Sequence, residues 1–122
     1  MLWKYQGGRA GDTTKQMLDP LPAYITLLKA GNVNLVTVIG GTNDRTGGQL
    51  DLGTTKQNIR RIVRTFLQNG IAVVLCNDTP RRKGSSQYEL AQAAWRQDYY
   101  DCSRWVLTNM WQMCALANTF DA

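Results

Sequence analysis

An asparagine and an aspartate directly follow an apolar run and a pair of glycines in the segment VTVIGGTNDRTGG, residues 36–48. The run before Gly40 and Gly41 is β-branched and typical of a strand, and paired glycines let the chain turn sharply where that strand ends. Asn43 then presents an amide, which can donate hydrogen bonds to a ligand. Asp44 presents a carboxylate, which can orient the loop by accepting backbone N–H bonds. The pattern indicates polar groups held at the end of a strand.

General-base and metal chemistry have few candidate residues. The 122 residues include no histidine, so the chain lacks the ordinary general base near neutral pH and the commonest zinc ligand. Asp12, Asp44 and Asp78 each follow a predicted strand and would form an acidic or metal-binding cluster if they met. Capping and turn roles explain these aspartates more simply. We therefore expect no metal and no cofactor.

Three serines and one cysteine are the candidate nucleophiles. Ser85, Ser86 and Ser103 lie in a basic loop or a predicted helix, and no histidine is present to activate them. Cys76 ends a predicted strand near the proposed site, but a thiol in an apolar strand is typically a small core residue. The sequence shows no independent catalytic unit.

Alternating strand and helix patterns are expected to position these residues. Apolar runs predict strands at residues 2–5, 34–40 and 71–77. Apolar residues at helical spacing predict helices at 13–29, with a break at its prolines, 54–68, 86–98 and 102–118. The second and third strands are mostly apolar, so we expect both of their faces to be buried. This order predicts right-handed crossovers and an α/β fold, a three-layer sandwich around a parallel sheet.

Length and composition predict a single α/β domain over residues 1–122. No apolar run is long enough to cross a bilayer, and the first residues lack the apolar stretch of a secretory signal. The cysteines Cys76, Cys102 and Cys114 form an odd set that fits reduced thiols better than disulfides. We therefore expect a cytoplasmic protein without a membrane span.

The net charge of +5 comes largely from two basic clusters, residues 60–64 and 81–83. Such clusters can neutralise the phosphates of a nucleic acid. The first cluster lies at helical spacing among apolar residues and the second in a polar loop, and neither is interleaved with aromatic residues that would stack bases. Nucleic-acid binding is therefore not the expected function.

The segments AGDTTKQML, residues 10–18, and VTVIGGTND, residues 36–44, resemble the second and third sequence blocks of the SGNH or GDSL hydrolase family. Members of that family are esterases and lipases on a flavodoxin-like fold. The segment VVLCNDTPRR, residues 73–82, is similar to the strand that follows in the family. The resemblance covers nearly the whole chain in order and spacing. It implies the central portion of an SGNH hydrolase domain, with an incomplete flavodoxin-like sheet.

The resemblance also implies roles for two residues. The family's second-block glycine, whose backbone N–H binds the oxyanion, matches Gly11, and its third-block asparagine, another oxyanion donor, matches Asn43. The family's Gly-Asp-Ser and Asp-x-x-His blocks have no match, since no serine precedes Gly11 and one residue follows Asp121. We expect acyl-ester hydrolysis by an acyl-enzyme route in the complete enzyme, and no activity of the isolated chain.

Two other functions remain open. In the family's strand order, the missing serine-bearing strand would lie beside residues 34–40, and its absence would leave unpaired strand edges. The chain would then be a non-catalytic assembly protein that self-associates or pairs with a complementing chain. The glycine-rich segment GGRAGDTT, residues 7–14, would alternatively bind phosphate or a nucleotide, although it lacks a complete P-loop or GxGxxG pattern.

Overall fold

A computed structural model describes residues 7–9, 11–41, 43–44, 50–77 and 101–117. The helices are α1 (Thr14–Leu18), α2 (Leu21–Ala30) and α4 (Leu52–Gln68), and the strands are β1 (Leu35–Val38), β2 (Ala72–Cys76) and β3 (Ala115–Ala117). A further helical segment covers residues 101–109. The strand predicted at 2–5 and the helix predicted at 86–98 lie outside the described residues.

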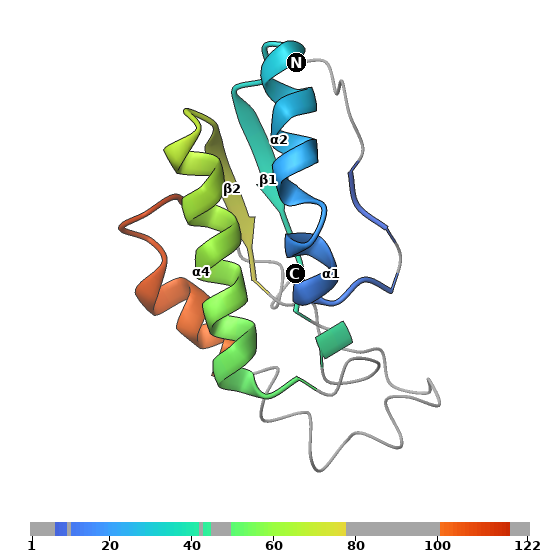
Figure 1. Ribbon diagram of the computed structural model, residues 1–122. Helices are drawn as coiled ribbons and strands as arrows, with labels where there is room; N and C mark the ends of the chain where they lie inside the picture. Colours follow the sequence, from blue (N-terminus) through green and yellow to red (C-terminus); the bar gives the residue numbers. More distant parts are fainter. Residues whose placement is uncertain (1–6, 10, 42, 45–49, 78–100, 118–122) are drawn as a thin grey trace.

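The three strands form one parallel sheet in the order β1-β2-β3, with α2 and α4 beside it (Figure 1). The register aligns Val38 of β1 with Leu75 of β2, and Leu75 with Leu116 of β3. Parallel neighbours need a crossover connection, which α4 provides between β1 and β2. The fold is therefore of the mixed α/β class, as the alternating pattern predicts. Within the described part of the chain, no helix is both long and apolar enough to span a bilayer.

Helix α4 forms where the sequence predicts it and begins two residues earlier. The Asp51 side chain caps its first turn by accepting the Thr54 N–H at 2.7 Å. Gly70, at φ +74°, follows the last turn in the left-handed region that favours glycine. The buried side chains repeat along one stripe of the helix, at Thr55, Asn58, Ile59, Ile62, Val63 and Phe66. This stripe fixes the face that α4 turns toward the sheet.

The predicted helix over 13–29 is interrupted at its prolines, as expected. Helix α1 ends at Leu18 and α2 begins at Leu21, with Pro22 in its first turn, where a missing N–H costs no hydrogen bond. At the start of α1, Thr13 accepts the Gln16 N–H at 3.2 Å and the Gln16 side chain accepts the Thr13 N–H at 2.9 Å. This capping box stabilises a helix of only five residues.

The prediction that β1 is buried on both faces is wrong. Val36 and Val38 belong to or pack against the core, whereas Leu35 is 38% exposed, Thr37 is exposed and Ile39 is 50% exposed. The core side of the sheet packs against α2, α4 and the segment 101–110. Because these described helices cover one face only, the described residues form two layers. The predicted third layer is not seen among them.

The prediction of a helix over 102–118 is wrong in its second half. The helical segment ends at residue 109, and Met110, fully buried, anchors the turn that follows by accepting the Met113 N–H at 3.0 Å. Residues 115–117 then form β3 along the edge of β2. An Ala-Leu-Ala sequence favours a helix by propensity, but the open backbone groups at the edge of β2 offer hydrogen bonds that override it.

Candidate functional site

The predicted site lies beyond the carboxyl end of β1, where the chain turns through two glycines. Gly41 is buried and has φ +117°, a conformation that side chains other than glycine rarely adopt. A Cβ on Gly40 would lie 2.5 Å from the Met17 sulfur, so α1 approaches the strand end closely at this point. The first glycine therefore makes room for α1, and the second makes the turn that leads to Asn43.

Asn43 lies against the loop that contains Gly11. Its side-chain Nδ2 donates to the backbone carbonyl of Asp12, the neighbour of Gly11, at 3.2 Å. Gly11 is exposed, has φ +86° and has open space where a side chain would project. Among the described residues, no hydrogen bond engages the Gly11 N–H. The fold thus brings the two predicted donor residues to the same end of the sheet, although they are 32 positions apart.

Asp44 is fully buried and is hydrogen-bonded at every polar atom. Its backbone N–H donates to Gly41 at 3.1 Å, and its carbonyl accepts from Leu50 at 2.7 Å. Its carboxylate accepts the Thr14 N–H at 2.7 Å, the Thr14 hydroxyl at 2.6 Å and the Thr55 hydroxyl at 2.5 Å. The sequence predicts a carboxylate that accepts backbone N–H groups. The structure shows one such bond and two from hydroxyls.

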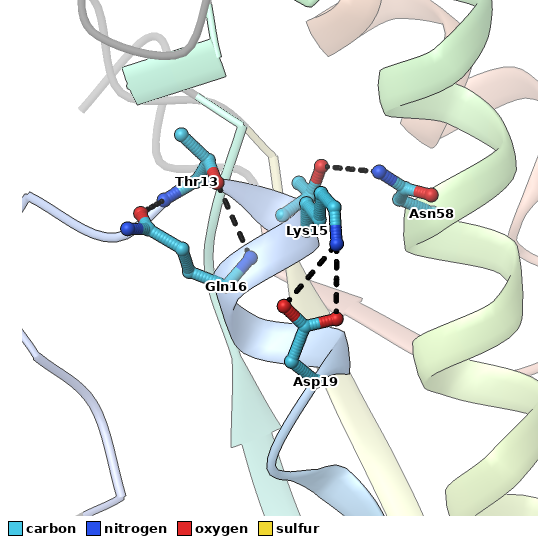
Figure 2. A network of polar contacts seen from close by, with 6 residues as sticks. Thr13, Lys15, Gln16, Asp19 and Asn58 are labelled. Carbon is cyan, nitrogen blue, oxygen red and sulfur yellow. Dashed lines mark hydrogen bonds and ion pairs between the residues drawn. The ribbon is translucent and has the colours of Figure 1, made fainter.

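Thr14, Thr55 and Asn58 belong to the site but were not predicted from the sequence. Thr14 begins α1, and the other two lie in the first half of α4. Figure 2 shows the Asn58 side chain reaching from α4 to α1, where Nδ2 donates to the Thr14 hydroxyl at 3.0 Å. The available signal was the pair of adjacent threonines at the start of each helix, at 13–14 and 54–55. Such pairs indicate helix caps, and only the fold shows that the second threonine of each pair faces Asp44.

The acidic cluster has no support among the described residues. Asp12 forms an exposed ion pair with Arg9 at 3.2 Å, and the Asp44 oxygens are already bonded to threonine groups. Asp78 lies outside the described residues. Across the described ranges, no group of three or more His, Cys, Asp or Glu side chains is placed to hold a metal ion.

The candidate nucleophiles that the structure describes are poorly placed for attack. Cys76 is buried, and burial raises the pKa of its thiol, which disfavours the reactive thiolate. Ser103 is 3% exposed, and its Oγ accepts from Asn77 Nδ2 at 2.7 Å. Ser85 and Ser86 lie outside the described residues.

Three backbone N–H groups of the glycine-rich segment before α1 already have acceptors. The N–H of Asp12 donates to Arg9, that of Thr13 to Gln16 and that of Thr14 to Asp44. A phosphate would have to displace these acceptors, one of which is a buried carboxylate. The N–H groups of Asp12, Thr13 and Thr14 are therefore already engaged in this structure.

A groove of about 400 Å³ lies between α1 and α4, outside the predicted site. Lys15, Asp19, Asn58 and Arg61 are among the residues that line it. Lys15 and Asp19 lie one turn apart on the α1 side and form an ion pair at 3.3 Å, as Figure 2 shows, and both side chains are largely exposed. Neither of the two predicted donors lines this groove. The groove is thus separate from the point where the donor loops meet.

No family model, no curated protein and no solved structure matches the chain. The function proposed below therefore rests on the contacts between the loops that contain Gly11 and Asn43.

Proposed function

We propose that this chain supplies the oxyanion-binding part of a carboxylic-ester hydrolase of the SGNH type, on an incomplete flavodoxin-like fold. The donors are the backbone N–H of Gly11 and the side-chain amide of Asn43. The observation that supports this proposal best is the hydrogen bond from Asn43 to the Asp12 carbonyl at 3.2 Å. It joins the two segments that resemble the family, residues 10–18 and 36–44.

The chemistry follows from the charge that an ester develops during attack. When a nucleophile adds to the carbonyl carbon, the π electrons move to the oxygen, and donors fixed at that point lower the barrier by about 3 kcal/mol each. An amide nitrogen carries two protons, and Nδ2 of Asn43 donates one of them to the Asp12 carbonyl. The chain has no histidine, so the proposal assigns nucleophile and base to other polypeptide segments.

The proposal is tested by titrating the ¹⁵N-labelled chain with methyl butylphosphonate, whose tetrahedral anion resembles the ester intermediate. We expect saturable shifts of the Gly11 amide and the Asn43 side-chain amide. Asn43→Ala should abolish the shift at Gly11. Asn69→Ala is the matched control, because Asn69 Nδ2 also donates to a backbone carbonyl, that of Thr65, at the other end of α4. Equal binding by both variants would contradict the proposal.

A second function, assembly, is favoured by the exposed face of the sheet. Leu35 and Ile39 are exposed on the face of β1 that the described helices leave open. The register continues this face through Ala72 of β2, which is also exposed. Parallel sheets normally bury both faces, so an open apolar face favours self-association or a complementing chain.

Light scattering coupled to size exclusion tests this second function over a dilution series. We expect a concentration-dependent mass that falls to the monomer value in Ile39→Lys. Leu27→Lys is the control, because Leu27 is 47% exposed but lies on α2 rather than on the sheet. A monomer at every concentration, before any substitution, would show that the exposed face needs no partner.

A further inference from the structure

We propose that Thr55 is a positioning residue, through which the first turn of α4 sets the place of the Asn43 donor. The link is the Asp44 carboxylate, which accepts the Thr55 hydroxyl at 2.5 Å and follows Asn43 directly in the chain. This inference rests on the proposed role of Asn43 as a donor. Its test includes a measurement that needs no ligand.

The direction of the Thr55 bond follows from its single proton. Its hydroxyl lies 2.5 Å from the Asp44 carboxylate and 3.2 Å from the Asp51 carbonyl. One proton serves one acceptor well, and the shorter, charge-assisted contact is the stronger. Thr55 therefore donates to Asp44, and the α4 backbone retains only the longer contact.

The direction of the hydrogen bond between Thr14 and Asp44 follows from a second partner of the Thr14 hydroxyl. Its hydroxyl accepts from Asn58 Nδ2 at 3.0 Å, so its own proton is left for the Asp44 carboxylate at 2.6 Å. Thr14 and Thr55 are fully buried, and Asn58 is 8% exposed. A buried network has no water to replace a lost partner, so each of its bonds constrains the carboxylate strongly.

These bonds connect the donor loop to the best-packed helix that the structure describes. Helix α4 has 17 residues and contributes Ile59, Ile62, Val63 and Phe66 to the core. Because all polar atoms of Asp44 are engaged, the backbone at Asn43 cannot shift without breaking at least one buried bond. Removal of the Thr55 hydroxyl breaks the direct bond to α4 and leaves the carboxylate to Thr14, which contacts α4 only through Asn58.

The experiment compares Thr55→Val, which keeps the shape and removes the hydroxyl, with Thr55→Ser, which restores it. We expect the Asn43 side-chain amide resonances of the valine variant to move toward their values in an unfolded peptide. Its affinity for methyl butylphosphonate should fall about tenfold. The serine variant should return both toward the wild-type values. Thr65→Val is the matched control, because Thr65 lies on the same helix and its hydroxyl donates only to the Arg61 carbonyl.

A merely structural role predicts a different result. Thr55→Val would then lower the urea midpoint, while the Asn43 resonances and the phosphonate affinity of the folded variant would match the wild type, and this outcome would overturn the inference. If the valine variant does not fold, Asn58→Ala tests the other end of the network, and the same resonances should shift in the same direction. Unchanged Asn43 resonances there would also overturn it.

The wild-type titration separates this inference from the proposed function. If wild-type protein shows no saturable phosphonate binding, the role as oxyanion donor is wrong. The response of the Asn43 resonances to Thr55→Val still decides whether Thr55 positions that side chain.

Discussion

Replacement of Asp44 by asparagine is expected to destabilise the fold far more than any exposed aspartate would. Asparagine keeps the shape but turns one carboxylate oxygen into an NH₂ group, which donates hydrogen bonds rather than accepting them. That group would face a donor in either orientation of the amide, because one carboxylate oxygen accepts the hydroxyls of Thr14 and Thr55 and the other accepts the Thr14 N–H. In either case the two hydroxyls lose a charged acceptor in a fully buried place.

The expected cost follows from these two bonds. Hydrogen bonds to charged groups contribute about 1.5–3 kcal/mol each. The Thr55 hydroxyl can recover part of its loss at the Asp51 carbonyl, now 3.2 Å away, whereas the Thr14 proton has no such substitute among the described residues. We therefore expect the free energy of unfolding to fall by about 2–4 kcal/mol. This is a large share of the roughly 5–15 kcal/mol typical of a domain.

Urea denaturation followed by circular dichroism measures this loss. The midpoint of Asp44→Asn should fall by about 1–2 M with an unchanged slope. Asp19→Asn is the matched control, since it changes the charge equally but affects an exposed ion pair with Lys15, worth less than about 1 kcal/mol. A difference between the two variants of less than about 0.5 kcal/mol would refute the view that Asp44 is held by buried bonds.

Three further predictions concern activity, backbone strain and pH. The isolated chain should hydrolyse short aryl esters no more than a few-fold faster than buffer, and a robust kcat that disappears in Asn43→Ala would reveal an unrecognised nucleophile. Gly41→Ala should cost about 1–3 kcal/mol in urea denaturation because of φ +117°, and an unchanged midpoint would show that the turn relaxes freely. Burial raises the pKa values of the Cys76 and Cys114 thiols above their usual value, so the unfolded chain loses these protons first as the pH rises. Stability should fall above about pH 9, less steeply in a Cys76→Ala, Cys114→Ala double variant, and equal slopes would contradict this cause.

The sequence predicted the elements whose patterns are local. The stripe of α4, its cap and the break between α1 and α2 follow from residue spacing and from Pro20 and Pro22, and all are present. The apolar runs of β1 and β2 likewise form strands. Local pattern could not predict β3, because its helix-favouring sequence pairs with β2 through contacts about forty positions away.

The exposure of one face of β1 could not be predicted either, because it too depends on distant parts of the chain. Leu35 and Ile39 have the composition of a buried strand, but burial depends on what covers the face, which the strand itself does not encode. The candidate site also has a part that local sequence predicts and a part that it does not. The residue types of Gly41 and Asp44 and their position after the strand predict a turn and an orienting carboxylate, whereas the Thr55 contact depends on how α4 approaches the loop.

We propose that Gly11 and Asn43 donate to one developing oxyanion. Proton–phosphorus correlation spectroscopy of the chain with methyl butylphosphonate tests it most directly, because it identifies which protons contact the bound anion. We expect the Gly11 backbone proton and an Asn43 side-chain proton both to correlate with the same phosphorus signal. Correlations to the backbone protons of Thr13 and Thr14 without Asn43 would contradict it and favour a phosphate-binding site instead.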